Sequence, residues 1–278
     1  MIALMLATTH LYQGYEAPTT TDTKFIEDFS NASLDSIIAV PSSKWKNLPP
    51  HGLSRPPNPA RAIWILSRIP PLPTGRGEDT MIAELANPFL YEIDFYLSDD
   101  DEIIDHQATG LKVSHDKRAN PPPYFQYRFK QHPTKWLNLY VRTMTPSAQS
   151  LRWSLQTEVN HVKLSQKRSL LLGCITGAII AIILYNLVLG ILLHEPIHFL
   201  YAATEIATLT VGSLLTGMIT LPFPELTDNH QLFYRLTFMT FFVVCIASMH
   251  FASSLLSLGI NFPRLSRILY TCDVIAVV

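Results

Sequence analysis

The chain has 278 residues, a formal net charge of −1, 48% hydrophobic residues and a mean hydropathy of +0.18. Because the charge is close to zero and no run of lysine and arginine occurs, the sequence excludes the basic surface typical of nucleic-acid-binding proteins. Charged residues are frequent up to Arg168 and scarce after it, which predicts one part in water and one part in lipid.

The first 19 residues are interpreted as the remnant of a signal peptide. The segment from Met1 to Ala17 begins apolar but lacks the positive charge that normally precedes the apolar run of a signal peptide. The alternative stays open that this segment is no signal, in which case the first membrane helix must direct export.

Residues 20–160 are predicted to form an all-β domain, either a jelly roll or another β-sandwich. In residues 89–97 apolar side chains alternate with Glu92 and Asp94, which is the period-two pattern of a strand with one buried face. The other predicted strands are residues 62–66, 124–129, 136–143 and 151–156. Proline-rich stretches separate these strands and predict loops, and no helical run is expected in the domain.

The predicted domain is rich in aromatic residues, which serve either as core or as a binding platform. We expect Trp64, Phe95 and Trp136 to lie in the core, since rings dominate burial in small sandwiches. Sugars stack their C–H faces on rings while polar side chains hold their hydroxyls, so a ligand site is predicted at Tyr96, Tyr124, Arg128 and Arg142. The aromatic residues considered are Trp45, Trp64, Tyr91, Tyr96, Tyr124, Tyr127, Trp136, Tyr140 and Trp153.

After a juxtamembrane linker at residues 161–168, the sequence predicts a bundle of membrane-spanning α-helices. Residues 169–193 carry no charge over a length that exceeds the roughly 20 residues needed to cross a hydrocarbon core. Further spans are predicted at residues 197–221 and 232–258 and a truncated one at 268–278, so the fold class is a β domain followed by three full spans and part of a fourth. We expect more helices to follow in a longer protein.

The order of these parts resembles the bacterial seven-transmembrane receptors with diverse intracellular signalling modules, in the variant with the second type of extracellular domain. The segments that carry the resemblance are Phe25–Asp28, Ser33–Asp35, Ala62–Ile65, Asn87–Pro88, Tyr91–Leu97, Thr109–Gly110, Leu139–Arg142 and Leu184–Leu187. The resemblance implies an extracellular jelly roll, seven helices, and an output domain after the last helix. It also favours an N-terminus outside the cell, which the positive charges beside the first and third spans do not decide.

Enzymatic activity is not expected. The sequence lacks the phosphate-binding, serine-hydrolase, zinc-protease and Cys-x-x-Cys motifs. Its three cysteines, Cys174, Cys245 and Cys272, lack the spacing of metal ligands and all lie in the apolar half. No metal and no cofactor are therefore predicted.

Polar groups inside the predicted spans suggest a switch. Glu205, His250 and Asp273 fall at similar depths, about 10–12 Å from the cytoplasmic ends of their helices. Buried charges in membranes usually face the bundle or a cavity, so one hypothesis is a shared polar cluster whose histidine changes charge near neutral pH. The alternative is that the three groups act separately.

Gly173, Gly177 and Ala181 form a series of small residues along the first span. Such a series lets two helix backbones approach closely. Packing against a helix of the same chain is the preferred interpretation, and a homodimer contact is the alternative.

Together these features predict a bacterial inner-membrane protein with its N-terminal domain in the periplasm or outside the cell. The domain would bind a small molecule, such as a carbohydrate, and residues 159–168 would couple it to the helices. The rival hypothesis is a membrane-anchored carbohydrate-binding module with no signalling role.

Overall fold

The computed structural model describes residues 22–50, 52–71, 79–99, 102–118 and 123–256. These residues belong to two compact units, which are described separately. One unit holds the strands together with residues 158–166 and Thr216–His230, and the other holds the rest of the helices. The Asp273 position and the predicted span at 268–278 lie outside the described residues, as does the predicted signal-peptide remnant.

The larger sheet of the β unit has six antiparallel strands in the order β2-β1-β4-β9-β6-β7. Five of the six have the length of ordinary strands and β2 is short. Their bounds are β1 Asp22–Asp28, β2 Lys46–Asn47, β4 Ala62–Ile69, β6 Glu92–Asp99, β7 Glu102–Thr109 and β9 Leu137–Met144.

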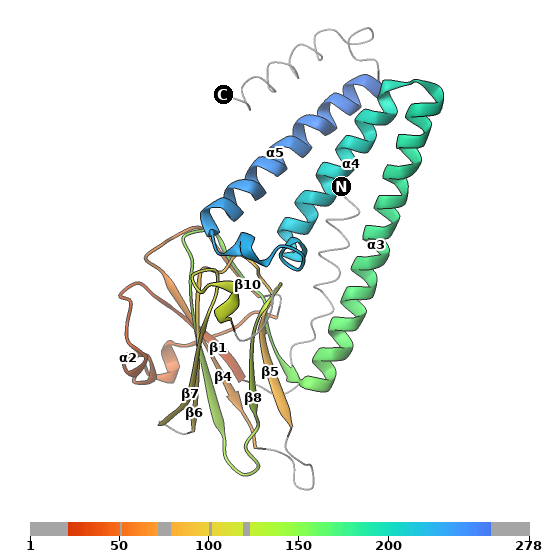
Figure 1. Cartoon of the computed structure of the whole chain (residues 1–278). Coiled ribbons are helices and arrows are strands. Elements are labelled where there is room, and N and C mark those ends of the chain that lie inside the picture. The colour runs from red at the N-terminus through yellow and green to blue at the C-terminus, as the bar shows by residue number, and fades with distance from the viewer. Residues whose placement is uncertain (1–21, 51, 72–78, 100–101, 119–122, 257–278) are drawn as a thin grey trace. The chain divides into compact units, whose positions relative to one another are not determined.

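Two smaller antiparallel sheets complete the unit. One has three strands in the order β11-β5-β8, and the other pairs β10 with β3. Their bounds are β3 Leu53–Arg55, β5 Thr80–Leu85, β8 Phe125–Lys130, β10 Gln149–Leu151 and β11 Trp153–Thr157. Phe95 of β6 stacks on Tyr127 of β8 at 5.4 Å between ring centroids, so the large and three-stranded sheets pack face to face (Figure 1). The prediction of an all-β sandwich is confirmed.

Alternation along the strands fills the space between the sheets. Ile63, Ile65 and Val141 of the large sheet are fully buried, and so is Phe95. The prediction that Trp64 and Phe95 lie in the core is confirmed, whereas the same prediction for Trp136 was wrong. Trp136 is 45% exposed because it precedes the first residue of β9, and its ring lies under the Arg68 guanidinium at 4.8 Å.

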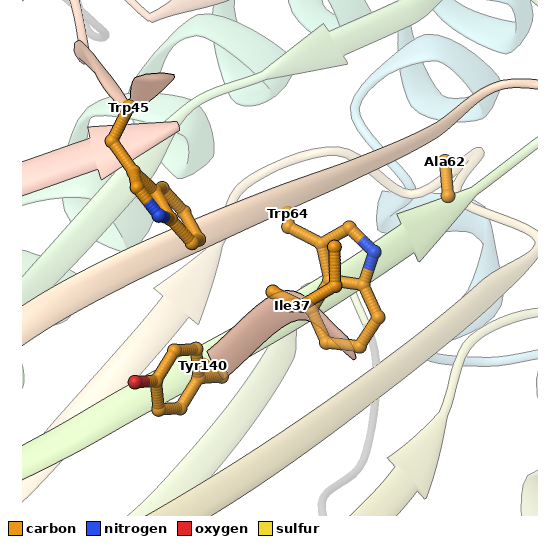
Figure 2. Close-up of a cluster of buried hydrophobic side chains, with 5 residues drawn as sticks. All are labelled: Ile37, Trp45, Ala62, Trp64 and Tyr140. Carbon is orange, nitrogen blue, oxygen red and sulfur yellow. The ribbon is translucent and has the colours of Figure 1, made fainter. Parts of the chain in front are cut away.

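A short helix that was not predicted covers the outer face of the large sheet. Helix α2 (Leu34–Ile38) begins after Ser33, whose hydroxyl accepts a hydrogen bond from the Ser36 amide at 3.4 Å. A 3-10 turn, η1 (Ser42–Lys44), follows it. Figure 2 shows the apolar cluster that this segment forms with β4 and β9, made of Ile37, Trp45, Ala62, Trp64 and Tyr140.

Three long helices follow the sandwich: α3 (Glu158–Leu193), α4 (Pro196–Leu215) and α5 (His230–Leu255). Helices α3 and α5 are long and apolar enough to cross a membrane. They are candidate spans at the places predicted for residues 169–193 and 232–258. Helix α4 falls short of that standard because Glu205 and several threonines lower its hydropathy, so three full spans are not established. The predicted linker at 161–168 is helical, because α3 begins directly after β11.

Candidate functional site

A cavity of about 250 Å³ opens on the outer face of the large sheet, beneath α2 and η1. Apolar side chains of the covering segment line one wall, and polar and aromatic side chains line the rest. The polar and aromatic lining consists of Asp22, Lys24, Ser42, Trp45, Arg68, Asn138 and Tyr140. We call this cavity the Trp45 pocket.

The floor of the Trp45 pocket is made by neighbouring strands in register. Lys24 of β1 lies opposite Leu66 of β4, which lies opposite Tyr140 of β9. The adjacent row on the same face runs from Asp22 through Arg68 to Asn138. Because residues two apart share a face, the alternation of three strands brings these side chains together although they lie far apart in sequence.

The pocket combines ring surfaces with separate polar groups. The Trp45 and Tyr140 rings lie 6.5 Å apart at an interplanar angle of 59°, so they present two differently oriented faces. The Lys24 ammonium pairs with the Asp22 carboxylate at 2.8 Å, and the Lys24 side chain is 28% exposed. Ring faces beside an ammonium, a guanidinium, a carboxylate and an amide suit a small polar molecule that carries both C–H surface and hydroxyl groups.

Two of the four predicted ligand residues lie on this same face of the sheet. Tyr96 of β6 is the register partner of Tyr140 and stacks on His106 at 4.4 Å. Burial, together with the neighbouring Asp94 carboxylate, raises the pKa of Tyr96, so the phenol stays neutral. Tyr96 lies beside Tyr140 on this face but is not part of the lining of the Trp45 pocket.

The second, Arg142, already has its hydrogen-bonding groups in use. Its Nη1 donates to Glu92 at 2.9 Å and to Asp94 at 3.3 Å, and its Nη2 donates to the Asn31 side chain at 2.6 Å. Burial opposes ionisation of Glu92, but the hydrogen bonds from Arg142 and Lys112 outweigh it and lower the pKa of this carboxyl. With 9% of its surface exposed, Arg142 ties β9 to β6 and is poorly placed to hold a ligand.

The other two predicted residues lie on the opposite sheet. Tyr124 precedes β8 and is 4% exposed. Arg128 is on β8, where its side chain is 58% exposed and pairs with Glu158 at 3.2 Å. The structure thus does not bring the four predicted residues together into one site.

Sequence reasoning considered Trp45 and Tyr140 among the aromatic residues but missed the charged and amide groups beside them. Lys24 and Arg68 belong to strands whose mutual register is invisible in the sequence. The alternation of β1, with Asp22, Lys24 and Ile26 on one face, is the one local signal that points to this surface.

The start of α3 is fixed to the outer face of the three-stranded sheet. The Glu84 carboxylate of β5, 1% exposed, contacts the His161 ring nitrogen Nε2 at 2.8 Å and accepts a hydrogen bond from Gln126 at 2.9 Å. His161 is itself 8% exposed. Residues 158–166, here called the α3 stem, are therefore part of the packed sandwich and not a separate linker.

Comparison with protein families matches both halves of the chain. The model for the 7TMR-DISM extracellular 2 domain matches residues 20–157, and the model for the 7TM diverse intracellular signalling domain matches residues 168–278. The chain belongs to the 7TMR-DISM receptors. It is therefore a membrane protein with an N-terminal extracellular domain and a signal-receiving role.

The remaining comparisons add little to this assignment. A search of curated proteins found no match. A solved structure of β-glucosidase from Kluyveromyces marxianus in complex with glucose aligns with 54% of this chain and 18% of its own length, at 10% identity and a TM-score of 0.27. A likeness this low carries no argument about the receptor.

In the receptor's helical unit, the predicted polar groups can be placed only in part. Tyr201 and Glu205 lie one turn apart on α4, and the Tyr201 ring packs on Phe251 of α5 at 5.0 Å between ring centroids. This ring contact joins α4 and α5 at the residue that follows His250 in the chain. Since Asp273 lies outside the described residues, the three-membered cluster stays a prediction.

The small-residue series of α3 has open space beside two of its members. Among the described residues, and apart from its chain neighbours and the nearby backbone of α3 itself, no atom lies within 4 Å of a Cβ added to Gly173 or Gly177. Ala181 continues the series one turn further along α3. Both a homodimer contact and packing against another helix of the receptor stay predictions.

Proposed function

We propose that the extracellular domain of this receptor binds a small polar ligand of the carbohydrate class in the Trp45 pocket. The observation that supports it is the pairing of two ring faces, Trp45 and Tyr140, with the hydrogen-bonding groups of Lys24, Arg68 and Asn138 in one cavity. A volume of about 250 Å³ suits one monosaccharide unit and excludes a long oligosaccharide from full enclosure.

Binding acts as a signal if the helices have two arrangements for which the ligand-bound domain has different affinities. An output domain of the whole receptor then reads the shift in their populations. We place the receptor in the inner membrane of a bacterium, with the sandwich in the periplasm or outside the cell. In that place the Trp45 pocket would meet sugars of the envelope or of the environment.

The rival function, a carbohydrate-binding module that is merely anchored, requires no specific contact between the sandwich and the helices. The fixed α3 stem argues against it, since a simple anchor functions with a loose connection. The buried Glu84–His161 contact fixes the α3 stem, residues 158–166, to the sandwich.

The test is a thermal-shift and calorimetric titration of the full chain in lipid nanodiscs. The probes are glucose, galactose, N-acetylglucosamine and glucuronate, which share a pyranose ring and differ in charge and substituents. We expect at least one of them to bind saturably, and Trp45→Ala to weaken that binding by about tenfold or more, which corresponds to about 1.4 kcal/mol.

Two lysines, one in the pocket and one outside it, separate the effect of losing a pocket group from the general effect of losing a surface charge. Lys24→Ala removes a pocket group, whereas Lys112→Ala removes an exposed lysine paired with Glu92 outside the pocket. Only Lys24→Ala should weaken binding. Equal effects of the two substitutions, or no binding of any probe, would contradict the proposal.

A further inference from the structure

The connection between α4 and α5, residues Thr216–His230, is packed with the sandwich and not with the helices that it joins. It contains two 3-10 turns, η3 (Met218–Thr220) and η4 (Pro224–Thr227). The sandwich contacts it chiefly through residues 111–118, which follow β7 and end in the 3-10 turn η2 (His115–Lys117). We call residues 216–230 the α4–α5 connection.

An ionic contact holds the end of the α4–α5 connection. The Asp228 carboxylate accepts a hydrogen bond from the His115 backbone amide at 2.8 Å and lies 2.7 Å from the His115 ring nitrogen Nδ1. Partial burial opposes ionisation, but the His115 contacts and the nearby Arg118 outweigh it and lower the pKa of Asp228. Because the Asp228 carboxylate contacts both the backbone and the side chain of His115, it fixes the position of this end of the connection against His115.

A buried arginine supports the same contact. Arg118, 9% exposed, donates through Nη1 to the Thr227 hydroxyl at 2.9 Å and through Nε to the Val113 carbonyl at 2.8 Å. Thr227 is 2% exposed, and its hydroxyl donates a hydrogen bond to the Pro224 carbonyl at 2.8 Å. Without the connection, Arg118 would lose its hydrogen bond to Thr227. Because buried polar groups that lose a partner are costly, this bond stabilises the docked position of the connection.

The first part of the connection fits against two prolines of the sandwich. Gly217 has φ +73°, and a Cβ there would lie 2.9 Å from Cβ of Pro88 and 3.0 Å from Cβ of Pro123. Both the left-handed backbone and the close approach require glycine. At the other end of the connection, the His230 ring packs on Tyr91 at 4.7 Å between centroids.

We propose that the α4–α5 connection is a docking element of the extracellular domain, so that this domain holds its helices at two places, the α3 stem and the ends of α4 and α5. Because the connection contacts the sandwich, both lie on the same side of the membrane. Helices α3 and α4 therefore cross it and return, which makes α4 a membrane span despite Glu205.

Strand β6 relates this contact to the Trp45 pocket. Its residue Tyr96 lies opposite the pocket residue Tyr140. Tyr91, the residue directly before β6, packs on His230 at the start of α5. A shift of β6 against β9 on ligand binding would therefore reach α5 directly. This last step rests on the proposed function, whereas the docking itself does not.

The test uses hydrogen–deuterium exchange of the full chain in nanodiscs without any ligand. We expect amides of residues 216–228 to be protected in the wild type. Asp228→Ala should increase their exchange by about tenfold and leave β4 and β9 unchanged. The matched control is Glu225→Ala, which removes an exposed carboxylate of the same connection and should change nothing.

Other outcomes overturn the inference. Solvent-like exchange of residues 216–228 in the wild type, or equal exchange in the Asp228→Ala and Glu225→Ala variants, would show that the connection is not docked. A second substitution, His115→Ala, removes the same contact from the side of the sandwich. It should likewise increase the exchange of residues 216–228 and leave β4 and β9 unchanged. Since no sugar is present, failure here leaves the ligand proposal standing, and absence of sugar binding leaves the docking standing.

Discussion

The α3 stem and the α4–α5 connection attach the same sandwich to its helices by different chemistry. In the stem the central carboxylate, Glu84, is 1% exposed and its partner His161 is 8% exposed. In the connection the corresponding side chains, Asp228 and His115, are 35% and 29% exposed. A buried polar contact is costly to leave unmade, whereas a half-exposed one exchanges readily with water. We therefore expect the Asp228–His115 contact of the connection to break more easily than the Glu84–His161 contact of the stem.

The largest effect is expected in the stem. Glu84→Ala leaves His161 and Gln126 without their acceptor in a buried place, and should lower the free energy of unfolding of the sandwich by about 2–3 kcal/mol. Denaturant unfolding followed by tryptophan fluorescence measures it. A double-mutant cycle with His161→Ala checks the cause, since the double variant should lose less than the sum of the two single losses.

A smaller and local effect is expected for Arg118. Arg118→Ala removes its bonds to Thr227 and Val113 and should cost the docked connection about 2 kcal/mol. Exchange of residues 216–228 should rise by more than tenfold while the melting temperature of the sandwich changes little. If Arg118→Ala instead lowered the melting temperature of the sandwich strongly and left the exchange of residues 216–228 unchanged, Arg118 would stabilise the sandwich and not the docked connection.

Acid should release the connection. The pKa of Asp228 is lowered in the docked state, so its contribution is fully present above the ordinary carboxyl pKa, near about 4, and is lost as the pH falls through the lowered value. Exchange of residues 216–228, corrected for its intrinsic pH dependence, should therefore rise below about pH 4. In the Asp228→Ala variant the same correction should leave a flat profile.

The smallest effect is expected at the surface of the stem. Arg128 and Glu158 form a pair whose side chains are 58% and 40% exposed, so Arg128→Ala should cost about 0.5 kcal/mol or less. A loss comparable to that of Glu84→Ala would mean that surface charges, and not the buried carboxylate, hold the stem. Denaturant unfolding of the two variants side by side makes the comparison.

The sequence predicted β4, β6 and β9 but missed β1, β5 and β7 among the longer strands. Strand β6 alternates and was found. In β5 every residue from Met81 to Leu85 is buried, because one face packs in the sandwich and the other lies under the α3 stem. Strand β7 is an edge strand with both Ile103 and Ile104 exposed, so it shows no alternation either. Where both faces of a strand are buried, or both are exposed, alternation gives no signal, and only a composition rich in β-branched and aromatic residues can reveal the strand.

The candidate site depended on relations that no single segment contains. Trp45 and Tyr140 were recognised as aromatic groups of interest, but their meeting requires α2 to fold over β4 and β9. Arg142 looked like a free cation in sequence, whereas three acceptors from β6 and the turn after β1 surround it. The docked connection is likewise invisible in sequence, because its partners lie about one hundred residues earlier.

The unbroken course of α3 from β11 into the lipid-facing segment has a geometric consequence. Each residue of an α-helix turns by about 100° and advances about 1.5 Å, so the stem sets the rotational phase of every side chain further along. Inserting a single alanine after Arg168 would turn the Gly173 face by about a quarter of a revolution while leaving the sandwich intact. Inserting four residues, slightly more than one full turn, would nearly restore that facing.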